Sequence, residues 1–208
     1  MIYSDFFPAQ KTAKFGIIIS DPKSVFNAID VVISKYKMKF KFQEIDRLGS
    51  SIFIPHWMSD NIYNLENCRI SVCEADGGCF YFCNLADSWN SLFYGVISDL
   101  KCDAVFLRSS PDLASKADFI QSFDVYNSGE IIRSAQIYFD QKWEFQSVGE
   151  PLDMERSFPY HVREKRKRLD RSSIIHVFKK FAPSEKSTGS FKIREWNRSG
   201  DMVSGSAR

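Results

Sequence analysis

The alternation of apolar and polar residues divides the first part of the chain into a strand, a helix and a second strand. Phe15 to Ser20 is a short β-branched run, and Asp21-Pro22 after it is typical of a helix start, with Asp21 as N-cap. Apolar residues then recur every three or four positions through about Lys37, which predicts one buried helix face. This stripe consists of Val25, Phe26, Ile29, Val32, Ile33 and Tyr36. From Met38 to Ile45 apolar residues alternate with lysine and glutamine, a pattern typical of a sheet edge.

A hairpin is the clearest local structure in the sequence. Arg69 to Glu74 and Cys79 to Asn84 flank Asp76-Gly77-Gly78, whose glycines supply the positive φ angles that a tight turn needs. The apolar period then predicts a helix from about Asp87 to Leu100 and a strand from Asp103 to Leu107. Strand, helix and strand in succession favour a right-handed βαβ crossover onto a parallel neighbour.

The pattern changes to a β-meander after a polar surface connection at residues 109 to 118. Three strands are predicted there, Phe119 to Tyr126, Ile131 to Phe139 and Trp143 to Val148. One crossover combined with one meander predicts an α+β fold with a mixed sheet rather than a fully parallel sheet.

The C-terminal part of the chain is predicted to be helical and then mobile. Tyr160 to Leu169 is a charged helix candidate, and a second helix after it is capped by Asp170 or Ser172 and ended by Pro183. Its buried stripe consists of Ile174, Ile175, Phe178 and Phe181. The residues from Ser184 onward are rich in serine, glycine and charge. We therefore expect one globular domain over residues 1–182 and a mobile C-terminal tail over residues 183–208.

Composition and charge exclude several classes of protein. The 208 residues, 44% of them hydrophobic, suffice for one core. The formal net charge of +2 is too small to indicate a nucleic-acid or membrane partner through the field of the whole molecule. No apolar run is long enough for a membrane span, and Met1 to Lys14 lacks the features of a signal peptide. We expect a cytoplasmic protein with no membrane partner.

The residues that bind metals or catalyse reactions show no recognised pattern. The chain has five cysteines without a CxxC pair, and its three histidines lack metal-ligand spacing. We therefore expect reduced cysteines, no metal and no cofactor. No GxSxG, Walker or GxGxxG motif is present, so no catalytic residue is assigned. The cysteines and histidines are Cys68, Cys73, Cys79, Cys83, Cys102, His56, His161 and His176.

The strongest local signal is the basic segment from His161 to Arg171, in which six basic residues stand against two acids. As a helix, the segment presents a stripe for phosphates or for a protein partner. The candidate contacts are Arg163, Arg166, Lys167 and Arg171. Alternatively, these residues form a solvated face, or Arg163 or Arg171 pairs with a partly buried acid such as Glu155.

Two stretches resemble a group of uncharacterised bacterial cytoplasmic proteins. The first runs from Asp76 to Asn84 and continues through Ser91 to Val105, and the second runs from Arg133 to Phe145 and continues through Gly149-Glu150-Pro151 to Asp170-Arg171. The resemblance implies one domain and, by analogy, an immunity or antitoxin-type protein. Our leading hypothesis is a non-catalytic protein-binding module. The alternatives are a nucleic-acid-binding protein that uses residues 161–171, and an enzyme with an unrecognised site.

Overall fold

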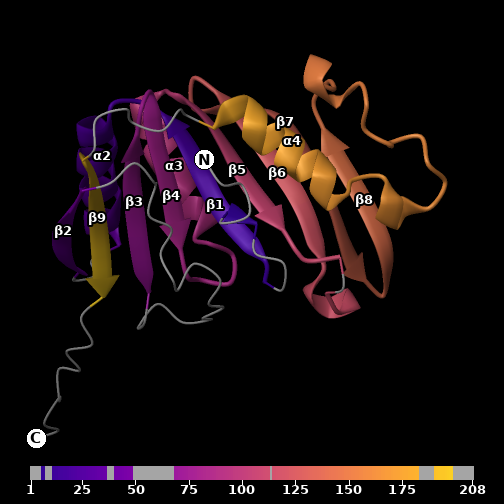
Figure 1. The fold of residues 1–208 in the computed structure, drawn as a ribbon, viewed down its shortest axis with the longest axis horizontal. Helices are drawn as coiled ribbons and strands as arrows, with labels where there is room; N and C mark the ends of the chain where they lie inside the picture. The colour runs from indigo at the N-terminus through magenta and orange to yellow at the C-terminus, as the bar shows by residue number, and fades with distance from the viewer. Residues whose placement is uncertain are drawn as a thin grey trace, which may run out of the picture.

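The fold is a single large sheet with helices on both faces. The computed structural model describes residues 6–7, 11–36, 40–48, 68–112, 114–182 and 190–198. Its strands are β1 (Ala13–Ile19), β2 (Phe40–Leu48), β3 (Arg69–Ala75), β4 (Gly78–Cys83), β5 (Asp103–Ser109), β6 (Ile120–Asn127), β7 (Glu130–Asp140), β8 (Lys142–Val148) and β9 (Ser190–Arg198). They form one nine-stranded sheet in the order β2-β9-β3-β4-β1-β5-β6-β7-β8, and each pair of neighbours is antiparallel (Figure 1).

The described helices lie on opposite faces of this sheet. The helix α4 (Arg171–Phe181) crosses the front of the sheet in Figure 1, and α2 (Pro22–Lys35) and α3 (Asn90–Leu100) lie behind it. Short 3-10 turns occur at η2 (Lys116–Asp118), η3 (Asp153–Glu155) and η4 (Lys165–Lys167). One apolar core lies between the sheet and α4, where Phe6 and Phe7 pack against Phe178. A second core lies between the sheet and the pair α2 and α3.

Local sequence signals account for α2 and for the hairpin. Asp21 caps α2 by accepting a hydrogen bond from the Ser24 backbone N–H at 2.9 Å, and Pro22 occupies the first helical position, as predicted. In the predicted hairpin, β3 and β4 meet at a turn in which Gly77 has a φ of +85°. The lysine-rich strand predicted as an edge is β2, which stands at one end of the sheet.

The helix α3 begins three residues later than its apolar period predicts. Ser88 and Trp89 precede it with φ angles of 58° and 46°, in the left-handed region that side chains rarely adopt. The helix then packs Phe93 directly over Gly16 of β1, where a Cβ atom would lie 2.1 Å from the ring. Only glycine fits at that position of β1 while Phe93 keeps its place.

The prediction that β4 and β5 are parallel neighbours joined by a crossover is wrong in the described sheet. The strands β4 and β5, which α3 connects, run in the same direction, but β1 lies between them and pairs antiparallel with both. The N-terminal strand fills the position that a parallel partner would take. The α+β class and the meander β6-β7-β8 are as predicted, while the sheet is antiparallel over the described residues.

The segment predicted as a mobile tail contains a strand inside the sheet. Residues 190–198 form β9, which pairs with β2 on one side and β3 on the other. Its Trp196 is buried and donates from Nε1 to Asp30 Oδ1 of α2 at 2.7 Å. Asp30 also pairs with Arg194 at 3.0 Å, so the charges of β9 are matched by residues far away in the sequence. The remaining predicted tail residues, 183–189 and 199–208, lie outside the described residues.

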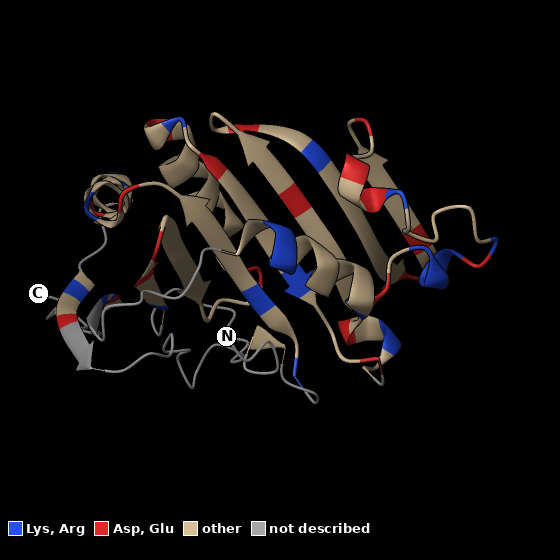
Figure 2. Cartoon of the chain, turned by 45° about the horizontal axis from the view of Figure 1, so that its top comes forward, with Lys and Arg blue, Asp and Glu red and all other residues tan. Residues whose placement is uncertain are grey.

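Charge is spread over the molecule rather than gathered by sign. Figure 2 shows basic and acidic segments interspersed along the described chain. This arrangement agrees with the small net charge and gives no extended field of one sign. Among the described helices, none is long and apolar enough to cross a membrane.

Candidate functional site

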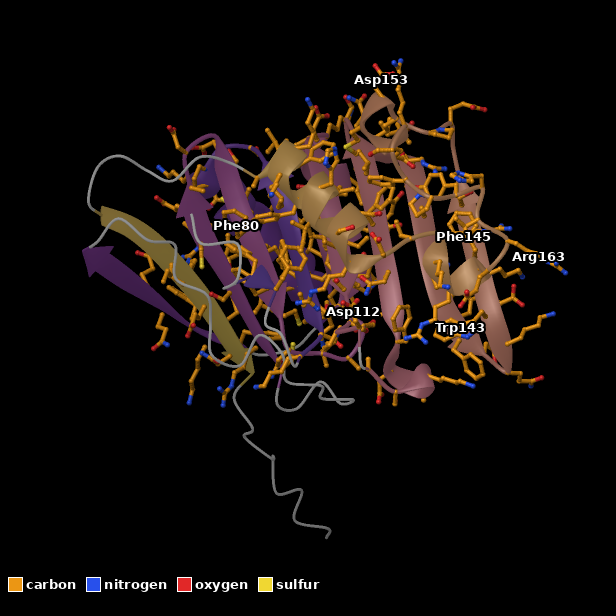
Figure 3. All side chains as sticks on the ribbon, turned by 45° about the vertical axis from the view of Figure 1, so that its right-hand side comes forward. Phe80, Asp112, Trp143, Phe145, Asp153 and Arg163 are labelled. Carbon is orange, nitrogen blue, oxygen red and sulfur yellow. The ribbon has the colours of Figure 1, made fainter. Side chains whose placement is uncertain are left out.

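The basic segment does not form the predicted helix but folds onto the strand β8. Between Tyr160 and Leu169 the chain makes turns, with one 3-10 turn at η4. Arg166 stacks over the rings of Phe119 and Trp143, at 5.4 and 5.2 Å from their centroids. The segment lacks an apolar stripe at helical spacing, and its cations find aromatic partners on the sheet instead. Figure 3 shows Trp143 and Phe145 along β8, on the side where this segment packs.

Two further cations of the segment hold it to the edge of the sheet. Lys165 forms an ion pair with Glu144 of β8 at 2.8 Å, and Arg168 lies over the ring of Phe145 at 5.6 Å. Glu144 and Phe145 are consecutive strand residues, so their side chains point to opposite faces. The segment therefore contacts both faces of β8 and wraps around this end of the sheet. The pKa of Glu144 is lowered by its hydrogen bond with Lys165.

The four predicted contact residues do not form one stripe. Arg166 is engaged by aromatic rings and by the Asp112 carbonyl, and Lys167 pairs with Glu164 at 2.7 Å. Arg171 begins α4 and lies over Phe7 at 5.7 Å. Arg163 is exposed and points away from the sheet in Figure 3. Arg166 and Arg171 therefore contact other parts of the fold, whereas Lys167, which pairs within the segment, keeps 67% of its side chain exposed.

We expect Arg166→Gln to lower the free energy of unfolding by about 0.5 to 1 kcal/mol, because the cation loses two aromatic partners. Arg163→Gln, the matched control in the same segment, should leave stability unchanged, because Arg163 is exposed like Arg166 but points away from the sheet and its rings. Urea denaturation of both variants measures the difference. Equal stabilities of the two variants would contradict the stacking argument.

Glu155 is a buried acid, but its partner is Arg133 rather than Arg163 or Arg171. The Arg133 Nη2 lies 2.7 Å from Glu155 Oε2, and Nε donates to Oε1 at 2.9 Å. Tyr160 donates to Oε2 at 2.5 Å, and the Leu152 N–H donates to Oε1 at 2.8 Å. Both charged side chains are essentially fully buried. With all these hydrogen bonds formed, the cluster anchors residues 149–160 to β7 and has a structural role.

The cysteines and histidines do not converge on a metal site in the described residues. All five cysteines are free thiols, and four of them are buried. Cys73 lies in the core under α4, whereas Cys79 and Cys83 lie in the core under α2 and α3. Over the described part of the chain no group of three or more histidine, cysteine or acidic side chains is placed to hold a metal ion. His56 lies outside the described residues.

A second candidate surface lies on the α2 and α3 side of the sheet, over the strands that these helices do not reach. The core under the two helices involves β9, β3, β4, β1, β5 and the end of β6. Beyond it, side chains of β5 to β8 that point to this side form a surface that we call the β6–β8 face. Its residues are Arg108, Ser122, Asp124, Tyr126, Ile131, Ser134, Gln136, Gln146 and Val148, with Tyr94 of α3 beside them. Ser122, Asp124 and Tyr126 are buried beneath their neighbours.

Polar side chains occupy the centre of the β6–β8 face. Arg108, Ser122, Gln136 and Gln146 lie opposite one another across four strands. Arg108 Nε donates to Ser122 Oγ at 2.9 Å, and Gln136 Nε2 donates to Gln146 Oε1 at 2.9 Å. In the next row Ser134 Oγ donates to Asp124 Oδ1 at 2.6 Å. These side-chain hydrogen bonds fix the positions of the polar groups on the face.

Asp124 is the most unusual group of this surface, since it is a carboxylate with only 8% of its surface exposed. Burial raises the pKa of its carboxyl, and the Ser134 hydrogen bond and nearby Arg108 offset this only in part. Its charge in turn adds to the effect of burial in raising the pKa of Tyr126. A desolvated carboxylate of this kind is characteristic of functional sites as well as of structural networks.

The sequence contains one indication of this site, an acidic residue within a predicted apolar strand. In the predicted strand from Phe119 to Tyr126, Phe123 and Val125 alternate with Ser122 and Asp124. An acid among apolar residues at the position of a central strand marks a polar patch on one face of the sheet. Its partners Arg108 and Ser134 lie on other strands, so the cluster becomes visible only when the register is known.

Apolar side chains border the polar centre. Ile131, Val148 and Tyr94 are between 48% and 65% exposed. Ile131 lies opposite Tyr126 in the register, and Val148 lies opposite Ser134. The Tyr94 ring is 6.3 Å from that of Tyr126. An apolar border around fixed polar groups is a composition found in protein interfaces.

No protein-family model matches this chain, and no curated protein or solved structure matches it. The function is therefore inferred from the geometry alone.

Proposed function

We propose that this chain is a non-catalytic protein-binding module whose contact surface is the β6–β8 face. The observation that supports the proposal is the exposure of Ile131, Val148 and Tyr94 around a fixed polar centre. Large apolar side chains exposed together mark interaction sites in folded proteins. The polar groups of this face hydrogen-bond to one another, as Ser134 does to Asp124, and no histidine or cysteine stands beside them among the residues of the face, which favours binding over catalysis.

The internal contacts of the basic segment also favour this proposal over nucleic-acid binding through residues 161–171. A phosphate-binding stripe needs several cations directed outward along one surface. Arg166 is stacked on Trp143, and Lys167 and Lys165 are paired with acids. The segment therefore serves as the cover of β8 in this structure.

The proposal predicts that one added charge on the face abolishes capture of a stoichiometric protein partner from a lysate of the source cells. Val148→Glu should lose the partner, because an ionised side chain in the apolar border of the interface is desolvated without compensation. Val31→Glu is the matched control, since Val31 is 48% exposed but lies on α2. Mass spectrometry of the captured fraction measures the molar ratio of partner to this protein for each variant.

Thermal melts establish that both variants fold, which is expected because both valines are exposed. Capture that is insensitive to Val148→Glu would place the partner elsewhere and overturn the assignment of the face.

A further inference from the structure

Asp124 differs from Glu155, another of the buried acids in the described part of the chain, in the number of acceptor positions that remain free on its carboxylate. Glu155 accepts hydrogen bonds from Arg133, Tyr160 and the Leu152 backbone. In the described part of the chain Asp124 accepts one side-chain hydrogen bond, from Ser134 to Oδ1. An ionised carboxylate has about four acceptor positions on its two oxygens. Asp124 therefore retains acceptor capacity at the surface it reaches.

The charged neighbour of Asp124 does not use this capacity. Arg108 lies on the adjacent strand β5, and its Nε donates to Ser122 rather than to the carboxylate. Arg108 acts on Asp124 through its charge alone. On the other side of Arg108, Lys14 of β1 donates to the Leu85 carbonyl at 3.1 Å. The titratable groups that face Asp124 are completed by Tyr126 and, beyond it, Tyr94.

We propose that the β6–β8 face receives a lysine side chain of a protein partner, whose ammonium group binds Asp124 between Arg108 and the tyrosines. This inference rests on the proposed function and names the chemistry of the partner at that face. An ammonium group on a flexible stem suits the site, because Asp124 is only 8% exposed and a bulky group could not approach its carboxylate. The half-exposed ring of Tyr94, which lies 6.3 Å from the buried ring of Tyr126, adds a cation–π attraction at this side of the site.

The apolar border favours a lysine within a protein chain over a free amine as the ligand. Val148 and Ile131 are exposed aliphatic residues next to the polar centre. Val148 and Ile131 can contact apolar residues that precede and follow the lysine in a partner's chain. Burying these apolar side chains against each other adds a hydrophobic contribution to binding. A charge-assisted hydrogen bond at the centre then supplies the specificity.

The test uses two capped tripeptides, Val-Lys-Val and Val-norleucine-Val, titrated into the full chain at pH 7 and followed by NMR. The amides of Asp124, Tyr126 and Ser134 should shift, and the lysine peptide should bind at least about tenfold more tightly than the norleucine peptide. Asp124→Asn should lower the affinity for the lysine peptide to that for the norleucine peptide. Asp153→Asn, which changes a carboxylate that is 92% exposed, should retain the tenfold preference.

Asp124→Asn is expected to fold. Burial raises the pKa of Asp124 in the folded state, so the folded protein holds this proton more tightly than the unfolded chain. The wild type therefore loses stability as the pH rises from the ordinary aspartate pKa to the raised pKa of the folded state. The variant lacks this loss and should therefore gain in melting temperature relative to wild type between pH 4 and pH 7. The comparison of the two peptides on the wild type is independent of this variant.

Equal binding of the two peptides to the wild type, no binding of either, or an undiminished lysine preference in Asp124→Asn would overturn the assignment. If partner capture nevertheless depended on Val148, the protein-binding function would stand and only the lysine would be wrong. If the lysine peptide were selected while no captured protein depended on Val148, the ammonium site would stand and the proposed function would fail.

Discussion

Trp196→Ala is expected to lower the free energy of unfolding by about 3 to 5 kcal/mol, the range for removing a large buried aromatic side chain. Trp196 is 1% exposed, its ring lies 6.2 Å from that of Phe26, and its Nε1 donates to Asp30. The substitution leaves a cavity between β9 and α2 and removes the hydrogen bond that joins them. Urea denaturation followed by circular dichroism measures the loss.

Lys192→Ala provides the control, because Lys192 is on the same strand and exposed. It should change the stability by no more than about 0.5 kcal/mol. Deleting residues 183–208 should be more severe than Trp196→Ala, since β3 and β2 then lose the strand between them. A deletion protein that melts like the wild type would show that β9 is dispensable, as the composition of this segment suggests.

Glu155→Leu is expected to destabilise the protein by about 3 to 5 kcal/mol, the cost of leaving a buried charge unpaired. Arg133 would remain in a site that is 2% exposed, and among the described residues it would keep the carbonyls of Val148 and Gly149 and the Tyr160 ring but no opposite charge. Tyr160 would also lose its acceptor. Residues 149–160, which this cluster anchors, should then become susceptible to proteolysis, and limited digestion with mass spectrometry locates the cuts.

The double variant Arg133→Met/Glu155→Leu should recover much of this loss, because neither side chain then carries an uncompensated charge. The exposed pair of Arg156 and Asp153 is the control, and Asp153→Asn should leave stability nearly unchanged. Equal effects of Asp153→Asn and Glu155→Leu would contradict the distinction between buried and exposed ion pairs.

Elements whose signals are local were predictable from the sequence. The cap at Asp21, the turn at Gly77 and the meander depend on residues close to one another along the chain. The start of α3 was placed too early, because an apolar period does not reveal the left-handed residues Ser88 and Trp89.

Elements whose polar side chains form ion pairs or hydrogen bonds with residues distant in the sequence were not predictable. The strand β9 has the composition of a tail, yet Arg194 pairs with Asp30 and Glu195 accepts from Gln43. The same holds for the basic segment, whose charge run suggested a helix while its aromatic partners lie on β8. Asp124 likewise becomes a candidate only through its cross-strand neighbours.

The place of β9 has a consequence for the order in which the chain can fold during synthesis. The strand β2 pairs only with β9 in the described sheet, and β9 follows it by about 150 residues in the chain. Until residues 190–198 have been synthesised, β3 presents an unpaired edge in the described sheet and β2 has no strand of that sheet to pair with. Such an edge can pair with strands of other chains, so the incomplete chain is vulnerable to misassembly at this stage. Long-range closure of this kind also slows folding, since distant segments must meet before the sheet is complete.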